Sequence, residues 1–199
     1  MPAGYRIFLL SPANCSGKRA GFLLRRDARS ALAQRLRSGG ATIGEVFTFM
    51  SGLYFRGKLA YARSFASPPE GAPGIQVIVP GLGLRSPETE VDLHALRAIA
   101  RVPVDPDNRR YVRPLQRDVS ELAARLATDD VVILLGSIAT PKYVQPLGDV
   151  LGSRLVVPQE FIGRGDMSRG SLMLKCAAAR RELAYVGVAE ATARTTAIT

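Results

Sequence analysis

Four loops of the sequence combine glycine, serine or threonine with a basic residue, and each comes after an apolar segment typical of a buried strand. Their sequences are "SPANCSGKR" (11–19), "GLGLRSP" (81–87), "GSIATPK" (136–142) and "GRGDMSRG" (163–170). Exposed backbone N–H groups and basic side chains suit the binding of an anionic group. The loops therefore predict a phosphate-binding site, and its candidate residues are Ser11, Asn14, Lys18, Arg19, Arg85, Ser137, Thr140, Lys142, Arg164 and Arg169.

The first loop resembles a phosphate-binding P-loop but lacks its pattern. A Walker A motif reads G-x-x-x-x-G-K-[ST]. Counting back from Gly17 and Lys18, the first glycine would fall on Pro12, and Arg19 stands where Ser or Thr would hold Mg²⁺. The chain is therefore not a P-loop NTPase. Lys18 and Arg19 either bind phosphate without a metal or are first-turn basic residues of a surface helix.

Two further side chains of these loops could take part in a reaction. Cys15 is interpreted as a small buried cysteine rather than a nucleophile, because no base is evident: the only histidine, His94, lies in another segment and is interpreted as structural. Asp166 could activate a water molecule, orient Arg164 and Arg169, or cap the following helix. With two cysteines and one histidine, we expect neither a metal site nor a cofactor.

The positive charge of the chain is concentrated in its first third. The formal net charge is +10, and residues 1–66 hold eleven Lys or Arg against only Asp27 and Glu45, a surplus of nine. A GC-rich coding sequence would explain the preference for arginine over lysine, but not this concentration at one end. The distribution favours nucleic acid or another phosphate-bearing partner.

Two stretches of the basic third are candidate contacts for nucleic acid. The predicted helix 19–37 carries Arg25, Arg26 and Arg29 on the side opposite its apolar stripe. The stretch "SGLYFRGKLAYARSF" (51–65) interleaves aromatic and basic residues, as base stacking combined with phosphate contact requires. The alternative is a core-facing aromatic stripe with basic residues pointing to water. The candidates in the second stretch are Tyr54, Arg56 and Lys58.

The elements that would position these residues alternate between strands and helices. We predict an α/β protein with a mainly parallel sheet of four to five strands and helices on both faces. It would form a single domain over 1–190, with the basic third at 1–66 and a flexible tail at 191–199. The predicted strands are 5–12, 75–81, 131–137, 154–158 and 184–188. The predicted helices are 19–37, 42–65, 88–100, 116–127, 168–183 and one that opens at Thr140–Pro141. A kink or close approach is expected at Gly52 and Gly57, and 102–114 is expected to be irregular. In such a sheet the four loops would meet at the carboxyl edge.

Short motifs give the chain a resemblance to known families. The turn "CSGKRA" (15–20) and the helix "LYFRGKLAYARSF" (53–65) resemble those of small, largely uncharacterised bacterial α/β domains. That group is similar to the YaaA family of peroxide-stress DNA-binding proteins, and "LLSPAN" (9–14) and "SGLYF" (51–55) are the matching segments here. Asn14 and Phe55 depart from the lysine and glycine of that family. The resemblance spans about residues 5–175 and implies a role connected with nucleic acid.

These observations predict a nucleic-acid-binding α/β protein that acts in repair, modification or defence. Its arginines would contact the backbone, and its strand-end loops would hold a nucleotide or a flipped base. If it is an enzyme, metal-independent hydrolysis of a glycosidic or ester bond with Asp166 as base fits best. The alternatives are an enzyme acting on a free nucleotide or nucleoside, and a non-catalytic module that docks an acidic protein partner. Without a signal peptide or an apolar run long enough to span a bilayer, we expect a cytoplasmic protein with no membrane partner.

Overall fold

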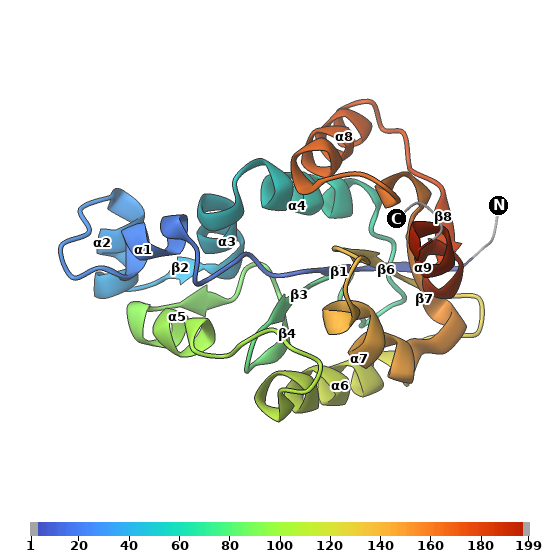
Figure 1. Ribbon diagram of the computed structural model, residues 1–199, viewed down its shortest axis with the longest axis horizontal. Helices are drawn as coiled ribbons and strands as arrows, with labels where there is room; N and C mark the ends of the chain where they lie inside the picture. The colour runs from blue at the N-terminus through green and yellow to red at the C-terminus, as the bar shows by residue number, and fades with distance from the viewer. Residues whose placement is uncertain (1–3, 197–199) are drawn as a thin grey trace.

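A six-stranded sheet forms the centre of the computed structural model, which describes residues 4–196 (Figure 1). The strand order is β4-β3-β1-β6-β7-β8, and the four inner strands run parallel to one another. The strands are β1 (Arg6–Leu10), β3 (Ile75–Val79), β4 (Gly83–Arg85), β6 (Val131–Leu135), β7 (Leu155–Pro158) and β8 (Tyr185–Gly187). The α/β class is confirmed, but the predicted number of four to five strands is too low, because β4 at one edge of the sheet was not predicted.

Helices cover both faces of this sheet. Alternate residues of β1 point to opposite faces, so that Phe8 and Leu10 pack with α4 and α8, whereas Ile7 and Leu9 pack with α6 and α7. Each face thus has a hydrophobic core of its own. The helices are α1 (Lys18–Leu24), α2 (Ala31–Ser38), α3 (Ile43–Ser51), α4 (Leu53–Phe65), α5 (Leu93–Ala100), α6 (Arg109–Ala123), α7 (Pro141–Leu151), α8 (Asp166–Ala178) and α9 (Val188–Thr196), with short 3₁₀ turns at Gly152–Arg154 and Gln159–Phe161.

The predicted helix 19–37 is instead two helices, α1 and α2. Arg25, the residue that ends α1, is extended (ψ 146°). Ser30 then caps α2, because its hydroxyl accepts a hydrogen bond from the Ala33 backbone N–H. Such a cap satisfies a backbone donor that has no partner within the helix, and so favours a new start here. Both helices lie beside a small two-stranded sheet, β2 (Ala41–Thr42) and β5 (Glu90–Val91), at the end of the molecule toward which β1 runs (Figure 1).

The segment 42–65 is interrupted at the glycines that the sequence indicates. Thr42 and Glu45 form a capping box at the start of α3. Gly52, at φ 57°, separates α3 from α4, and few residues other than glycine adopt this conformation. Gly57 faces Gly170 of α8, and a Cβ atom at Gly57 would lie 2.5 Å from the Gly170 carbonyl oxygen. The close approach predicted at Gly57 is therefore confirmed, and it brings α4 and α8 into direct contact.

The C-terminal half begins and ends its helices at other residues than predicted. The segment 102–114 is not wholly irregular, because Asn108 caps α6 by accepting a hydrogen bond from the Arg110 backbone N–H. The predicted tail is wrong for residues 191–196, which belong to α9, and the side chain of Ala191 is fully buried against β7 and β8. Residues 197–199 lie outside the described part of the chain. Within residues 4–196, no helix combines the length and the apolar character that crossing a membrane requires.

Candidate functional site

A cleft of about 510 Å³ opens at the carboxyl ends of the parallel strands. The chain leaves β1 toward β3 on one side, whereas β6 and β7 lie on the other, so the strand order reverses between β1 and β6. Loops diverge at such a point and leave a crevice in which α/β proteins bind ligands. Ser11 follows β1 and Ser137 follows β6, and both line the cleft. The predicted convergence of the strand-end loops is confirmed for these two loops, and the cleft between them is the candidate site.

Behind the cleft, a buried lysine is bonded to a serine that lines it. Lys58 reaches from α4 to the end of β1, where its amino group donates to the Ser11 hydroxyl at 2.7 Å and to the Ser11 carbonyl oxygen at 3.0 Å. Only 1% of Lys58 and 3% of Ser11 is exposed. A lysine this deeply buried is rare unless it is paired. Among residues 4–196 no carboxylate bonds to it, so hydroxyl and carbonyl dipoles are its hydrogen-bond partners.

Burial changes the protonation of this lysine. Removal from water disfavours the charged amine and lowers the pKa of Lys58 to about 7, and the nearby Asp166 carboxylate opposes this effect. The amino group also lies 4.0 Å from the centre of the Tyr54 ring, whose face attracts a cation. Near neutral pH, a substantial fraction of Lys58 is therefore the neutral amine, which can accept a proton.

Two tyrosines lie beside this pair, Tyr54 at Lys58 and Tyr143 at Ser11. Tyr54 and Tyr143 both line the cleft. The Tyr54 hydroxyl oxygen is fully buried and has no hydrogen-bond partner among the described residues. Arg169, also buried nearby, instead donates to the Phe161 carbonyl oxygen at 2.8 and 3.2 Å. An unpaired buried hydroxyl costs free energy unless a ligand or water satisfies it.

The aromatic and basic stretch 51–65 is a core-facing stripe. Phe55 and Tyr61 are fully buried, and Tyr54 is only 6% exposed. The Tyr61 hydroxyl accepts a hydrogen bond from the Leu183 backbone N–H, which ties α4 to the segment before β8. Lys58 was expected at the surface and is buried, so only Arg56 of the basic candidates in this stretch is exposed. Base stacking by Phe55 and Tyr61 is therefore a wrong prediction, because these rings are fully buried, and of the three aromatic residues only Tyr54 lines the cleft.

Six of the predicted site residues meet in the cleft. They come from the loops after β1 and β6 and from the starts of α4, α7 and α8, and they are Ser11, Asn14, Tyr54, Ser137, Lys142 and Asp166. The Asn14 side chain orders its own loop, since its oxygen accepts hydrogen bonds from the Ser16 backbone N–H and hydroxyl. The Cys15 thiol is buried, and burial raises its pKa to about 12. The predicted burial of Cys15 is confirmed.

The other predicted residues lie outside the cleft. Thr140 is exposed before α7, and Arg164 bonds to the Ser168 hydroxyl at 3.1 Å. His94 is exposed on α5 and not buried on its apolar side, contrary to its interpretation. Asp166 lines the cleft but 62% of its side chain is exposed, and it is the first residue of α8 rather than its cap. Further predicted residues are exposed basic side chains that do not line the cleft, and they are Lys18, Arg19, Arg25, Arg26, Arg29 and Arg56.

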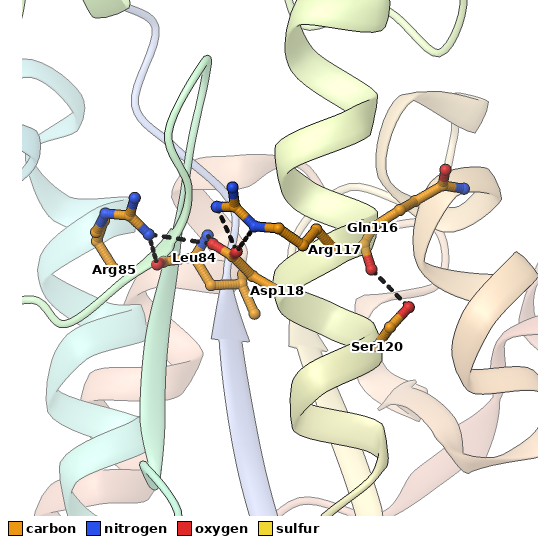
Figure 2. Close-up of polar contacts among 6 residues, drawn as sticks. All are labelled: Leu84, Arg85, Gln116, Arg117, Asp118 and Ser120. Carbon is orange, nitrogen blue, oxygen red and sulfur yellow. Dashed lines mark hydrogen bonds and ion pairs between the residues drawn. The ribbon is translucent and has the colours of Figure 1, made fainter.

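The prediction that Arg85 belongs to the strand-end site is wrong, and the fold explains why. The loop "GLGLRSP" is not an open strand-end loop, because Gly83–Arg85 turns back as β4 and pairs Arg85 with Val77 in the middle of β3. Its guanidinium therefore lies away from the carboxyl edge and forms an ion pair with Asp118 of α6 at 3.1 Å. Figure 2 shows Arg85 and Arg117 approaching the same Asp118 carboxylate, which also accepts a hydrogen bond from the Leu84 backbone N–H. This cluster fixes the edge strand to α6.

One wall of the cleft was not predicted from the sequence. Apolar side chains of α5 and of the segment after it face the polar loops, and they include Ile99, Val102 and Val104. The sequence "VPV" at 102–104 belongs to the stretch that was predicted to be irregular and on the surface. Two valines directly after an amphipathic helix are the signal that could have indicated a contact surface.

Comparison of the chain with protein families, with curated proteins and with solved structures returned no match. Within the described residues, no group of three or more His, Cys, Asp or Glu side chains is placed to hold a metal ion. Cleft chemistry must therefore be inferred from the side chains themselves.

Proposed function

We propose that this protein binds nucleic acid, with one nucleotide unit entering the cleft and a basic surface holding the backbone beside it. The basic surface consists of Lys18, Arg19, Arg25, Arg26 and Arg29. Such an arrangement suits a protein of nucleic-acid repair, modification or defence, in which a base leaves its stack to reach a pocket.

The observation that carries the proposal is that the cations of the basic surface lack partners. All five side chains are exposed, and none forms an ion pair or hydrogen bond with the described part of the chain. By contrast, Arg35 on the neighbouring α2 pairs with Glu45 at 2.8 Å. Like charges crowded without counter-charges repel one another, and a polyanion relieves this repulsion.

The position of the basic surface relative to the cleft supports one continuous site. Ser16 lines the cleft, and Lys18 and Arg19 follow it within three residues. The cleft offers serine, asparagine and lysine side chains on one wall and apolar side chains on the other. A phosphate and sugar suit the first wall, and the flat face of a base suits the second.

The resemblance to the YaaA family is consistent with this proposal. The segments that carry it are 9–14 and 51–55, and both contribute to the cleft through Ser11, Asn14 and Tyr54. The resemblance therefore concerns the residues of the candidate site and not only the strands that support it.

Fluorescence anisotropy of labelled single- and double-stranded DNA across a salt series tests the proposal. Replacing Arg25, Arg26 and Arg29 together by glutamine should weaken binding and reduce the slope of log K against log salt by about 2 on single strands and about 3 on duplex, since each lost phosphate contact removes about 0.7 or about 0.9. The matched control replaces three exposed arginines in the segments that follow α6 and α8 by glutamine. They are Arg125, Arg180 and Arg181.

The control variant loses the same charge but should keep the wild-type slope. An equal loss in both variants would show that only net charge matters and would contradict a defined basic surface. Weak binding that a mononucleotide abolishes would favour an enzyme acting on a free nucleotide. No binding of DNA, RNA or mononucleotide would leave the acidic protein partner as the better explanation of the basic surface.

A further inference from the structure

The Ser11–Lys58 pair has a geometry that the binding proposal does not use. A serine hydroxyl becomes a nucleophile when a base within hydrogen-bond reach takes its proton. The Lys58 nitrogen lies 2.7 Å from the Ser11 hydroxyl oxygen, inside the 2.6–3.2 Å range for proton transfer. Ser11 lines the cleft, whereas Lys58 lies behind it, so a ligand would meet the hydroxyl before the amine.

We propose that Ser11 is a nucleophile, with Lys58 as its general base, and that it accepts the acyl group of a small carboxylic ester bound in the cleft. The reaction is hydrolysis of the ester through an acyl-serine intermediate. This chemistry goes beyond the proposed binding of nucleic acid and does not depend on it. Serine–lysine pairs of this kind are a known variant of the serine–histidine arrangement.

The steps balance without a co-reactant other than water. The neutral Lys58 amine takes the hydroxyl proton while the Ser11 oxygen attacks the carbonyl carbon, giving a tetrahedral oxyanion. The bond from that carbon to the alcohol oxygen then breaks, and the Lys58 ammonium returns its proton to the leaving alcohol. Water next attacks the acyl-serine, again losing its proton to Lys58, and the carboxylic acid leaves as the serine hydroxyl is restored.

Lysine meets the requirement for a base near neutral pH. A surface lysine is protonated at pH 7 and cannot take a proton, but burial lowers the pKa of Lys58 to about 7. The carboxylate expected from the sequence, Asp166, is mostly exposed at the mouth of the cleft and bonds to Arg169 at 3.5 Å. Lys58 is thus the better-placed base, and it acts directly on the nucleophile.

Donors for the oxyanion lie in the same loop. The backbone N–H groups of Ala13, Asn14 and Cys15 form no hydrogen bond within the described part of the chain. All three residues line the cleft, as does Lys142. Main-chain donors that are already fixed in place are what stabilises a developing oxyanion in acyl transfer.

Covalent labelling with methanesulfonyl fluoride tests the proposal, because this small probe sulfonylates activated serines with loss of fluoride. Intact-mass and peptide mass spectrometry should show one methanesulfonyl group, located at Ser11. Ser11→Ala should abolish the label, and Lys58→Met should slow it by at least 100-fold, the effect typical of a lost general base. Ser64→Ala, which removes an exposed serine on the same helix as Lys58, should label as wild type.

The wild-type protein provides a second measurement in case Lys58→Met does not fold. The labelling rate, and the burst of p-nitrophenol from p-nitrophenyl acetate, should rise with pH through a midpoint near 7, because the reactive form is the neutral amine. A label elsewhere than Ser11, no label and no burst, or a rate that still increases tenfold per pH unit up to pH 9 would overturn the proposal. Any of these results would reduce Lys58 to a structural link between α4 and β1.

Discussion

Lys58 makes the stability of this protein depend on pH in a way that can be calculated. The pKa of its amine is about 7 in the folded chain and 10.5 in the unfolded chain. Between these values the unfolded chain binds the proton and the folded chain releases it, so the free energy of unfolding rises as pH rises. Below pH 7 both states are protonated, and this contribution is at its least favourable and constant.

The magnitude follows from the two pKa values. One pH unit corresponds to about 1.4 kcal/mol when the two states differ by a full proton. From pH 7 to pH 9 the difference approaches one proton, and the free energy of unfolding should increase by about 2 kcal/mol. Lys58→Met fills a similar volume without a titratable group and should lack this increase.

Urea unfolding at pH 7, 8 and 9 measures the effect for wild type, Lys58→Met and the Ser64→Ala control. The wild type and the control should gain about 2 kcal/mol relative to Lys58→Met over this range. Parallel pH profiles of wild type and Lys58→Met would refute the reasoning, because they would mean that the buried amine stays charged in the folded protein.

Three other predictions follow from local geometry. Gly170→Ala should destabilise the protein by several kcal/mol in urea unfolding, because its Cβ would lie 2.8–3.0 Å from backbone atoms of α4. The control Gly148→Ala has free space for its Cβ and should be neutral or stabilising by up to about 1 kcal/mol. Equal effects of the two substitutions would contradict the close contact between α4 and α8. Thr42→Ala should cost about 1 kcal/mol in the same assay, and no loss would mean that the capping box does not stabilise α3. Cys15 should resist iodoacetamide at pH 8 until urea unfolds the chain, and rapid alkylation of the folded protein would contradict its burial.

The alternation of apolar and amphipathic segments was sufficient to predict the class of fold. It identified the four parallel strands, because each is a short run of mainly apolar residues that are mostly buried, such as Val131–Leu135. The antiparallel edge strands are only three residues long, and Gly83–Arg85 contains too little pattern to be recognised. The break between α1 and α2 depends on a serine cap, and the apolar stripe continues across it at the same spacing.

Part of the site was predictable from the rule that strand-end loops converge. Ser11, Asn14, Ser137 and Lys142 were found in this way. The burial of Lys58 was not predicted, since lysine is usually a surface residue. A signal was present, because Lys58 lies four residues after Tyr54 and three before Tyr61, and these positions share one face of a helix. Reading the two tyrosines as core residues would have placed the lysine between them.

Hydrogen–deuterium exchange with and without a single-stranded DNA oligonucleotide tests the central claim most directly. If the cleft and the basic surface form one nucleic-acid site, the oligonucleotide should slow exchange both at 11–16 and at 25–37. Exchange should be unchanged at 180–187, which lies at the far edge of the sheet. Slower exchange at 25–37 alone, or at neither segment, would contradict the claim that a nucleotide unit enters the cleft.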